Sequence, residues 1–540
     1  MRKNVVFLLL IVFLGGLLRF WGLTNVPPSL YWDEVSQGYN AYSILKTGKD
    51  EHQESFPITR FQAFGDNKAP VNIYLTVISL GMFGKNDFSV RFPSAFLGTM
   101  TIVMTFFLVK FLFYYEKEKD LLALVSSLFL AISPWHIQLS RAAYEGNIAT
   151  FFTVAALALF FVSLVKNKWY FLGSVICFVL AFYSFNAHRV FIPIIVLFIG
   201  LLYWKNILKK KKVFFISITT GILLLLPFLF YLQTPESRLR FNEVNIFSDI
   251  GVIEQSNKLL ANDTVSILKV FDNRRVLFLE SYFKHYFDFY NPVYLFIKGD
   301  VNPRFSDQFN GELYLWILPL LLIGFYGLYL RKSRVALFIV GWFLIAPLAA
   351  ATARETPHAL RSETFIPVFE IISGVGVLSF FSSIKTHRSV YRTSVLFGCF
   401  IIVFSLYAFF HNYFSHNSKL NSYDWQYGYR QAIEYVESVK KDYNKIYFTN
   451  TYGRPSIYVA WYSNISPQEY WRGIRTVKDS VGFYNTPQLN NYFFVNEFPQ
   501  NIDNKTIIVT EQSKKLKDVS ILKTVNFLNG DPAFVIAKGK

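Results

Sequence analysis

The sequence predicts a mainly α-helical, polytopic membrane protein with a small α/β domain at its C-terminal end. Runs of roughly 17–25 apolar residues, the length that crosses a bilayer core, recur along the first three quarters of the chain. Of the 540 residues 53% are hydrophobic and only 17% are charged, whereas about 25% are charged in a typical soluble domain. Residues 413–540, by contrast, are polar and mix helical with strand patterns.

We expect about eleven transmembrane helices. If Arg2 and Lys3 are cytoplasmic, the basic loops "KNK", "KNILKKKK", "RKSR" and "KTHRSVYR" all fall inside, as the positive-inside rule requires. The N-terminus is then inside, and residues 413–540 lie outside a cytoplasmic membrane that the chain crosses many times. The predicted spans are 4–20, 89–112, 121–134, 148–165, 169–184, 190–204, 213–232, 312–330, 335–351, 363–381 and 394–411.

The predicted organisation is a transmembrane domain, 1–412, followed by an extracytoplasmic α/β domain, 413–540. "VNIYLTVISLGMFG" is apolar but too short to span, and reading it as a span would place "KKKK" outside. It therefore predicts an interfacial helix over 71–84, and a second is expected over 34–47. The long outer loops are expected at 21–88, 135–147, 233–311 and 352–362.

Charge and cysteine usage exclude several classes of protein. The net charge of +18 lies mostly in short loops beside apolar runs, where it reports orientation and lipid contact rather than nucleic-acid binding. Cys177 and Cys399 lie in separate apolar runs and form no disulfide framework. Metal-ligand spacing such as HExxH is absent from the sequence.

The ionisable residues that are not plain basic anchors gather in the outer loops, where such residues are functional candidates. The alternatives are a helix cap for Asp33 or Glu145, a solvated first-turn charge for Glu34, and contact with lipid headgroups for Lys68 or Arg141. The candidates are Asp33 and Glu34 in "YWDE", Lys68 in "FGDNKAP", Arg141 and Glu145 in "SPWHIQLSRAAYEGN", and His358 and Arg361 in "TARETPHALRSE".

Carboxylates and cations together at a lipid interface predict transfer from a phospholipid-linked donor. A carboxylate serves as general base on an acceptor hydroxyl. Arginine and lysine side chains hold a phosphate and stabilise it as it leaves. The lipid tail of the carrier would stay in the bilayer between helices.

The chain resembles the C-type glycosyltransferases of the protein O-mannosyltransferase and lipid A aminoarabinose transferase kind. The resemblance rests on "RFWGL", "YWDE" with "YNAYSILKTG", "KAPVNIYLTVISLGMFGKNDFSVRFPSAFLG", "SPWHIQLSRAAYEGN" and, more weakly, "PHALRSETFIPV". It implies an inverting transferase that moves a sugar from a polyprenyl-phosphate carrier to an acceptor hydroxyl on the outer face of the membrane. The acceptor class, whether protein, lipid or glycan, is left open.

The same resemblance implies residue roles. Asp33 corresponds to the catalytic or acceptor-positioning acid of the first outer loop, with Glu34 beside it, and Glu145 corresponds to a second acid. Lys68 and Arg361 correspond to groups that contact the donor phosphate, with His358 nearby and Arg141 as a further candidate. No cofactor is required, although a divalent cation shared by Asp33 and Glu145 is left open.

Two other functions fit the composition. A transporter or flippase of a lipid-linked substrate predicts ionisable residues near the bilayer midplane and an inverted repeat, and the sequence shows neither pattern clearly. A polymer transferase like the O-antigen ligases would use similar outer cations but would need no Asp-Glu pair in the first loop.

Overall fold

The computed structural model describes residues 2–64, 66–234, 237, 245–262, 268–478, 484–511 and 518–540. The described chain divides into two compact units. The first, which we call the membrane unit, comprises residues 1–20, 95–140 and 144–409. The second, the mixed unit, comprises residues 21–94, 141–143 and 410–540, so the first predicted outer loop groups with the C-terminal segment.

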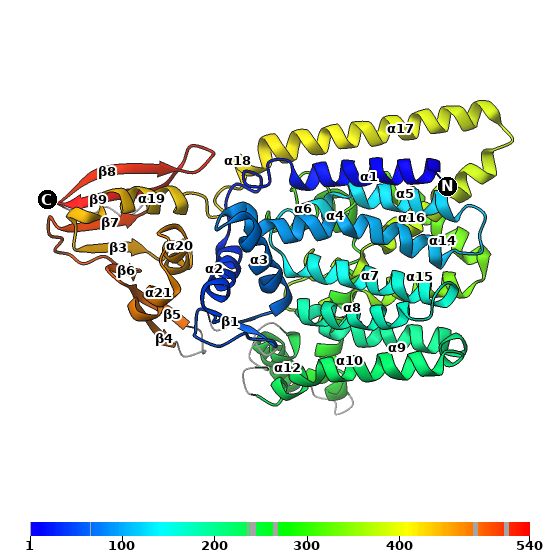
Figure 1. Cartoon of the computed structure of the whole chain (residues 1–540), viewed down its shortest axis with the longest axis horizontal. Helices are drawn as coiled ribbons and strands as arrows, with labels where there is room; N and C mark the ends of the chain where they lie inside the picture. The colour runs from blue at the N-terminus through cyan, green and yellow to red at the C-terminus, as the bar shows by residue number, and fades with distance from the viewer. Residues whose placement is uncertain are drawn as a thin grey trace. The chain divides into compact units, whose positions relative to one another are not determined.

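The membrane unit is a bundle of apolar helices whose axes run side by side (Figure 1). A described helix coincides with each of the eleven predicted spans. They are α1 (Arg2–Phe20), α4 (Asp87–Leu112, of which residues up to 94 count to the mixed unit), α5 (Lys119–Ile132), α7 (Glu145–Val165), α8 (Tyr170–Ser184), α9 (Asn186–Leu208), α10 (Lys211–Tyr231), α14 (Ile317–Arg331), α15 (Arg334–Ile345), α16 (Val368–Ile384) and α17 (Arg388–His411).

Among the described residues, eight helical stretches are long and apolar enough to cross a membrane; two of them extend α15 to Thr352 and begin α16 at Glu363. A ninth span arises if α5 and α6 (Pro134–Ser140), which meet at a bend of 59°, are counted as one. The apolar helices α8 and α14 are shorter, with 15 residues each. The predicted mainly α-helical, polytopic fold is therefore confirmed. The number of membrane spans depends on whether these shorter helices are counted as spans.

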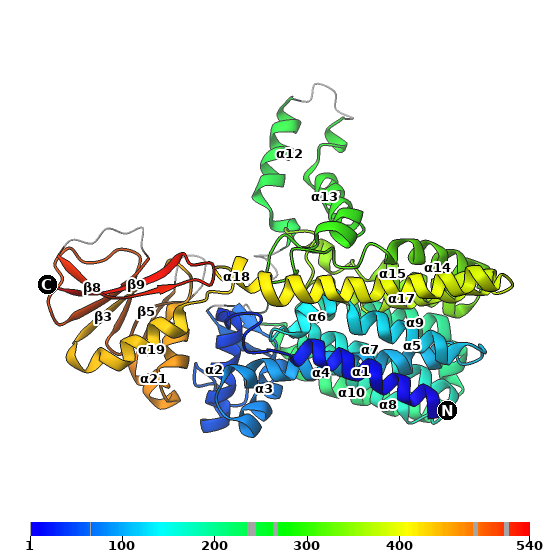
Figure 2. The same ribbon diagram turned by 90° about the horizontal axis from the view of Figure 1, so that it is seen from above.

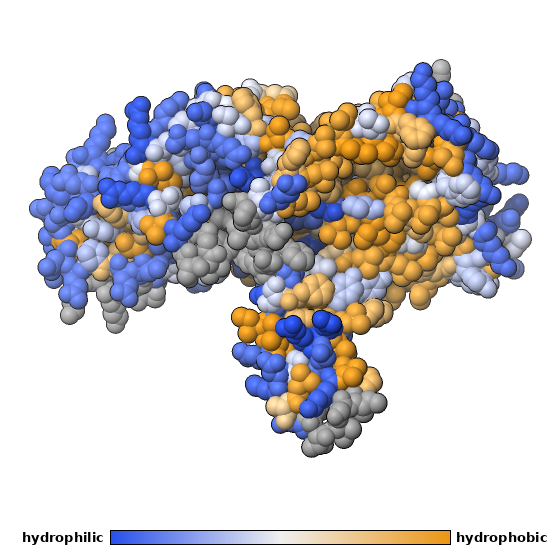
Figure 3. Space-filling model, turned by 90° about the horizontal axis from the view of Figure 1, so that it is seen from below, coloured by the Kyte–Doolittle hydropathy of each residue, from blue (hydrophilic) through white to orange (hydrophobic). Residues whose placement is uncertain are grey.

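Apolar side chains cover the flank of the bundle, as expected for a surface that faces lipid (Figure 3). Burial differs greatly between the helices: 78% of the residues are buried in the apolar 18-residue stretch of the span that contains α16, but only 6% in that of the span that contains α17. α14 and α16 pack most closely where a side chain on Gly324 or Gly376 would collide with a carbonyl of the other helix. Small residues at such positions let membrane helices approach each other.

Two amphipathic helices, α12 (Ile250–Asn262) and α13 (Arg274–Asp288), come from the long loop predicted over 233–311. They project away from the bundle of the membrane unit (Figure 2). The Tyr282 and Tyr286 hydroxyls of α13 donate hydrogen bonds to the carbonyl oxygens of Leu348 and Leu344, at 3.1 and 2.8 Å. These bonds anchor the base of α13 to the end of α15.

The C-terminal part of the mixed unit is a seven-stranded sheet in the order β4-β5-β6-β3-β7-β9-β8, with β3 parallel to β6 and β7. Its strands are β3 (Lys445–Thr449), β4 (Ile474–Lys478), β5 (Tyr484–Leu489), β6 (Tyr492–Val495), β7 (Thr506–Thr510), β8 (Val519–Asn526) and β9 (Pro532–Gly539). The helices are α18 (Ser418–Leu420), α19 (Tyr429–Val439), α20 (Pro455–Tyr462) and α21 (Pro467–Gly473). The predicted C-terminal α/β fold is thus confirmed.

The first loop supplies α2 (Trp32–Thr47), α3 (Pro70–Phe83) and a hairpin of β1 (Phe61–Ala63) and β2 (Asp66–Lys68). Helices therefore form where the sequence predicted them, over 34–47 and 71–84. α2 shares a core with the C-terminal helices. Tyr458 of α20 donates a hydrogen bond of 3.1 Å to the carbonyl oxygen of Leu30, and Tyr39 of α2 donates one of 3.2 Å to that of Ile465.

Lys85, between α3 and α4, ties this loop to α20. Its ammonium donates to the Trp461 carbonyl oxygen at 2.7 Å and lies 4.8 Å from the centres of the Tyr42 and Trp461 rings. Burial lowers the pKa of Lys85 to about 8, from a usual 10.5. The folded protein therefore loses this proton at a lower pH than the unfolded chain does.

Lys85 is expected to make stability rise with pH between about 8 and 10.5. Below pH 8 both states carry the proton and the full desolvation penalty is present; above pH 8 the folded state sheds it first and the penalty is relieved. The melting temperature of wild type minus that of Lys85→Met should therefore increase over this window. A difference that stays flat, or falls, would contradict the buried ammonium.

Candidate functional site

The start of α2 presents two adjacent carboxylates in its first turn. Tyr31 is the N-cap residue, so Asp33 and Glu34 lie inside the helix. The alternative that Asp33 caps this helix is therefore wrong. Carboxylates in the first turn are stabilised by the partial positive charge of the helix N-terminus. The two side chains nevertheless have very different surroundings.

Asp33 is the accessible carboxylate of the pair. Lys68, at the end of β2, donates to Asp33 Oδ1 at 2.6 Å and lies 3.3 Å from the Asp33 carbonyl oxygen. The Asp33 side chain is 39% exposed, whereas that of Lys68 is 7% exposed. An exposed acid held against a nearly buried ammonium forms a charged pair that is open to solvent on the Asp33 side.

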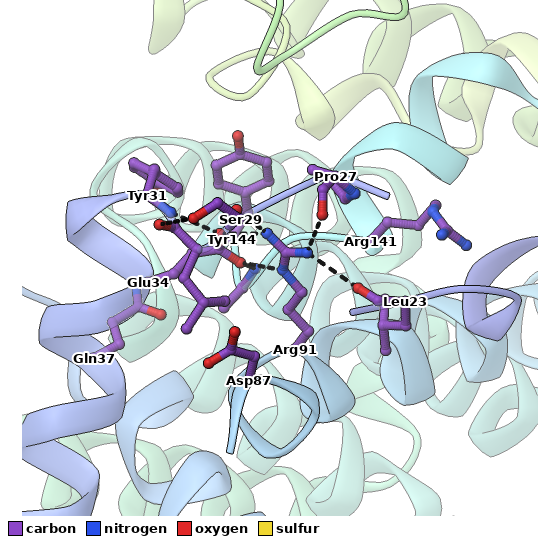
Figure 4. Close-up of polar contacts among 12 residues, drawn as sticks. Leu23, Pro27, Ser29, Tyr31, Glu34, Gln37, Asp87, Arg91, Arg141 and Tyr144 are labelled. Carbon is purple, nitrogen blue, oxygen red and sulfur yellow. Dashed lines mark hydrogen bonds and ion pairs between the residues drawn. The ribbon is translucent and has the colours of Figure 1, made fainter. Parts of the chain in front are cut away.

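Glu34 is fully buried in an ion pair with Arg91 of α4 (Figure 4). Arg91 Nε donates to Glu34 Oε1 at 2.9 Å, and Arg91 Nη2 donates to Oε2 at 3.0 Å. Glu34 also accepts the backbone N–H of Ala143 at 2.9 Å and that of Tyr31 at 3.2 Å. Four donors thus surround Glu34, and the alternative of a solvated first-turn charge is wrong.

Arg91 uses its whole guanidinium inside the protein. Besides its bonds to Glu34, it donates to the carbonyl oxygens of Leu23, Pro27 and Ser29 at 3.0, 2.7 and 2.5 Å (Figure 4). Arginine is suited to such a site because its five N–H donors are fixed in one plane. Arg91 therefore holds the segment before α2 and, through Glu34, the first turn that carries Asp33.

Arg141 is also buried in the mixed unit rather than extended to lipid headgroups. Its guanidinium donates to the Trp21 carbonyl oxygen at 2.7 Å and to that of Val26 at 2.6 Å, and it lies 4.8 Å from the Phe414 ring centre. These contacts fasten the second predicted outer loop to the beginning of the first loop.

The remaining predicted site residues belong to the membrane unit. Glu145 is the first residue of α7, after the N-cap Tyr144, so it does not cap that helix itself. His358 Nδ1 lies 3.8 Å from Asp300 Oδ2. The Arg361 guanidinium donates to the Glu355 carbonyl oxygen at 3.3 Å, and its positive charge favours the ionised form of Asp300.

Buried acids that the sequence did not single out support this part of the membrane unit. Asp300 accepts the backbone N–H groups of Asn302 and Ala359 at 2.8 and 2.7 Å, and Glu312 accepts that of Asp300 at 2.8 Å. Burial raises the pKa of Asp300.

Arg91 was also not among the predicted site residues, although its position in the sequence carries a signal. An arginine near the start of a predicted apolar span, here 89–112, is a candidate for a buried partner. No sequence pattern identified Glu34 as that partner. Among the described residues, no group of three or more His, Cys, Asp or Glu side chains is arranged to hold a metal ion.

Residues 67–231 match the family described as dolichyl-phosphate-mannose-protein mannosyltransferase. The matched range includes Lys68, Arg91, Arg141 and Glu145. No curated protein sequence is similar enough to this chain to count as a match.

Solved structures share the fold at low sequence identity. ArnT from Cupriavidus metallidurans, solved with undecaprenyl phosphate, is 10% identical, with a TM-score of 0.54 over 99% of this chain and 97% of its own. The Archaeoglobus fulgidus oligosaccharyltransferase AglB, solved with an inhibitory peptide and a dolichol-phosphate, is 15% identical over 85% of this chain, with a TM-score of 0.52.

A further structure of the Archaeoglobus fulgidus oligosaccharyltransferase contains zinc and sulfate and gives a TM-score of 0.53 at 14% identity. The alignments span 61–63% of the archaeal chain, whereas the alignment with ArnT spans nearly all of that enzyme. The family match and the shared fold together confirm that this chain resembles the C-type glycosyltransferases, as its sequence predicted.

Proposed function

We propose that the protein is an inverting glycosyltransferase that moves a sugar from a polyprenyl-phosphate carrier to an acceptor hydroxyl on the outer face of the cytoplasmic membrane. The observation that carries the proposal is the Asp33–Lys68 pair, in which an exposed carboxylate contacts a nearly buried ammonium at 2.6 Å. The family match and the lipid phosphates bound in ArnT and AglB support the donor class.

Asp33 acts as general base in this proposal. It takes the proton of the acceptor hydroxyl as that oxygen attacks the anomeric carbon, and the bond between the sugar and the phosphate oxygen breaks. Displacement from the opposite face inverts the anomeric configuration. Lys68 exchanges its contact with Asp33 for one with the departing phosphate and stabilises its charge.

The other residues have distinct roles. Glu34 and Arg141 are positioning residues, because their polar groups are bonded to the protein rather than directed at a substrate. Arg361 and His358 contribute to binding of the donor phosphate, and Glu145 is the second acid. The positive-inside pattern of the loops supports an inner N-terminus and an outer mixed unit.

Incubation of the purified protein with a panel of polyprenyl-phosphate sugars, in the presence of hydroxyl-bearing peptides, lipids and glycans as acceptors, tests this proposal. We expect one donor to be consumed with release of polyprenyl phosphate. Lys68→Met should raise the KM for that donor about 10- to 100-fold, because a hydrogen bond between two charged groups is worth about 1.5–3 kcal/mol.

Lys46→Met is the matched control, since Lys46 is an exposed lysine of α2. It should leave the KM for the donor unchanged. The proposal fails if no polyprenyl-phosphate sugar is consumed, or if Lys68→Met and Lys46→Met behave alike.

A further inference from the structure

A cavity of about 400 Å³ lies in the mixed unit beside the ends of β3 and β6. Its size is within the range of small-molecule sites, roughly 300–1,000 Å³. We call it the β3–β6 cavity. The residues that matter for its chemistry are Phe64, Asn450, Arg454, Ser456, Tyr484 and Asn496.

The topology of the sheet places this cavity where α/β proteins bind ligands. From β3 the chain passes to its parallel neighbour β6 on one side, and from β6 it crosses to β7 on the other side. Ligands of open α/β sheets bind outside the carboxyl ends of the strands, and the cavity lies at the carboxyl ends of β3 and β6. Asn450 and Asn496 directly follow β3 and β6, and Ser456 is in the first turn of α20.

The lining is polar and aromatic but holds no carboxylate among its described residues. Phe64, Tyr484 and Phe494 supply rings, while asparagine, serine and threonine side chains supply uncharged hydrogen-bonding groups. Within the part of the chain that the structure describes, the side chains of Asn450 and Ser456 make no hydrogen bond. Their donors and acceptors are therefore available to a ligand.

Among the lining residues that the structure describes, Arg454 is the charged one, and it helps to build the wall of the cavity. Its Nη1 donates to the Tyr484 carbonyl oxygen at 2.9 Å and to Asn485 Oδ1 at 3.1 Å, and its guanidinium lies 5.0 Å from the Phe64 ring centre. Aromatic faces beside amides and hydroxyls suit a sugar, which has apolar C–H faces and a rim of hydroxyl groups. An extended peptide would instead use backbone hydrogen bonds along a strand.

The cavity is joined to Asp33 and Lys68 through two contacts inside the mixed unit. Phe64 is at the turn of the β1–β2 hairpin that ends at Lys68, and its carbonyl oxygen accepts the Tyr484 N–H at 3.2 Å. Since Lys68 pairs with Phe61, the turn and Lys68 are about 10 Å apart along the hairpin. Gly453, which lines the cavity, packs directly against the ring of Trp32, the residue before Asp33.

We propose that the β3–β6 cavity binds a sugar unit of the acceptor, and hence that the acceptor is a glycan. This inference rests on the proposed function, which requires an acceptor hydroxyl at Asp33. A glycan bound in the cavity by one sugar unit presents the hydroxyl of a nearby unit to Asp33. The distance of about 10 Å between the hairpin turn and Lys68 matches the length of one or two sugar units. Recognition occurs away from the reacting group, so the cavity fixes acceptor choice rather than the chemical step.

A binding experiment on an array tests this proposal. The array carries neutral, N-acetylated and acidic oligosaccharides, with unglycosylated peptides on the same surface, and is probed with the full-length, detergent-solubilised protein. We expect binding to one class of oligosaccharide and none to the peptides. Asn450→Ala and Ser456→Ala should each weaken binding about three- to tenfold, the loss of one or two hydrogen bonds. Asn526→Ala, an exposed asparagine at the end of β8, should bind like wild type.

Donor consumption measured on the same samples separates this inference from the proposed function. The Asn450 and Ser456 variants should keep the wild-type KM for the donor and raise only the KM for the glycan. The inference is overturned if wild type binds no oligosaccharide, if it binds peptides instead, or if neither variant weakens binding. If the protein binds an oligosaccharide through Asn450 but consumes no donor, the proposed function alone is overturned.

Discussion

Replacing Asp33 with asparagine is expected to lower the rate of sugar transfer by about 10²–10⁴-fold, the usual contribution of a general base. Asparagine has the size of aspartate and keeps an oxygen near Lys68, but it cannot take a proton from the acceptor. Because the Asp33 side chain is 39% exposed, water and the asparagine oxygen replace part of the contact that Lys68 loses, so the loss of stability should be smaller than the roughly 3–5 kcal/mol of a fully buried pair.

The decisive measurement is kcat with saturating donor and acceptor, together with donor affinity and the melting temperature. Asp33→Asn should change kcat strongly and donor affinity only slightly. Asp442→Asn, an exposed aspartate of the same unit, should match wild type in all three. Turnover by Asp33→Asn near the wild-type value would exclude Asp33 as the base.

Replacing Arg91 with leucine is expected to lower the free energy of unfolding by about 3–5 kcal/mol, the cost of leaving a buried charge without its partner. Glu34 is fully buried, so water cannot replace the two guanidinium contacts at 2.9 and 3.0 Å. Three carbonyl oxygens, those of Leu23, Pro27 and Ser29, would lose their donor as well.

Unfolding of the detergent-solubilised protein by heat and by denaturant measures this loss. Arg430→Leu is the matched control, because Arg430 pairs with Asp87 at 3.5 Å and Glu434 at 2.8 Å while its side chain is 53% exposed. It should lower stability by no more than about 1 kcal/mol. Equal losses for the two variants would contradict a structural role of the Glu34–Arg91 pair.

A double variant separates the charge from the packing. Glu34→Leu combined with Arg91→Leu removes both buried charges, and such pairs are often replaced by apolar residues at little net cost. The double variant should therefore be more stable than Arg91→Leu alone. It should still transfer sugar poorly, because Ala143 and Tyr31 lose the acceptor that fixes the first turn of α2 and hence Asp33.

The sequence by itself determined the class of fold and the positions of the long apolar helices. Hydrophobic runs long enough for a bilayer are local signals, so α7 over Glu145–Val165 and α9 over Asn186–Leu208 could be placed from their own residues. The short helix α3, predicted to be interfacial, was recognised in the same way, from a run too short to span. Strand patterns were likewise recognised within residues 413–540, whereas the order and pairing of the strands β3 to β9 were not.

Only the tertiary structure decided what the charged residues do. Asp33 and Glu34 are neighbours in the sequence, yet one side chain is 39% exposed and the other is fully buried. The difference arises because Glu34 meets Arg91, 57 residues away, and Asp33 meets Lys68, 35 residues away. Pairings over such separations depend on how α2, β2 and α4 pack, and no local pattern of charge or hydropathy encodes that packing.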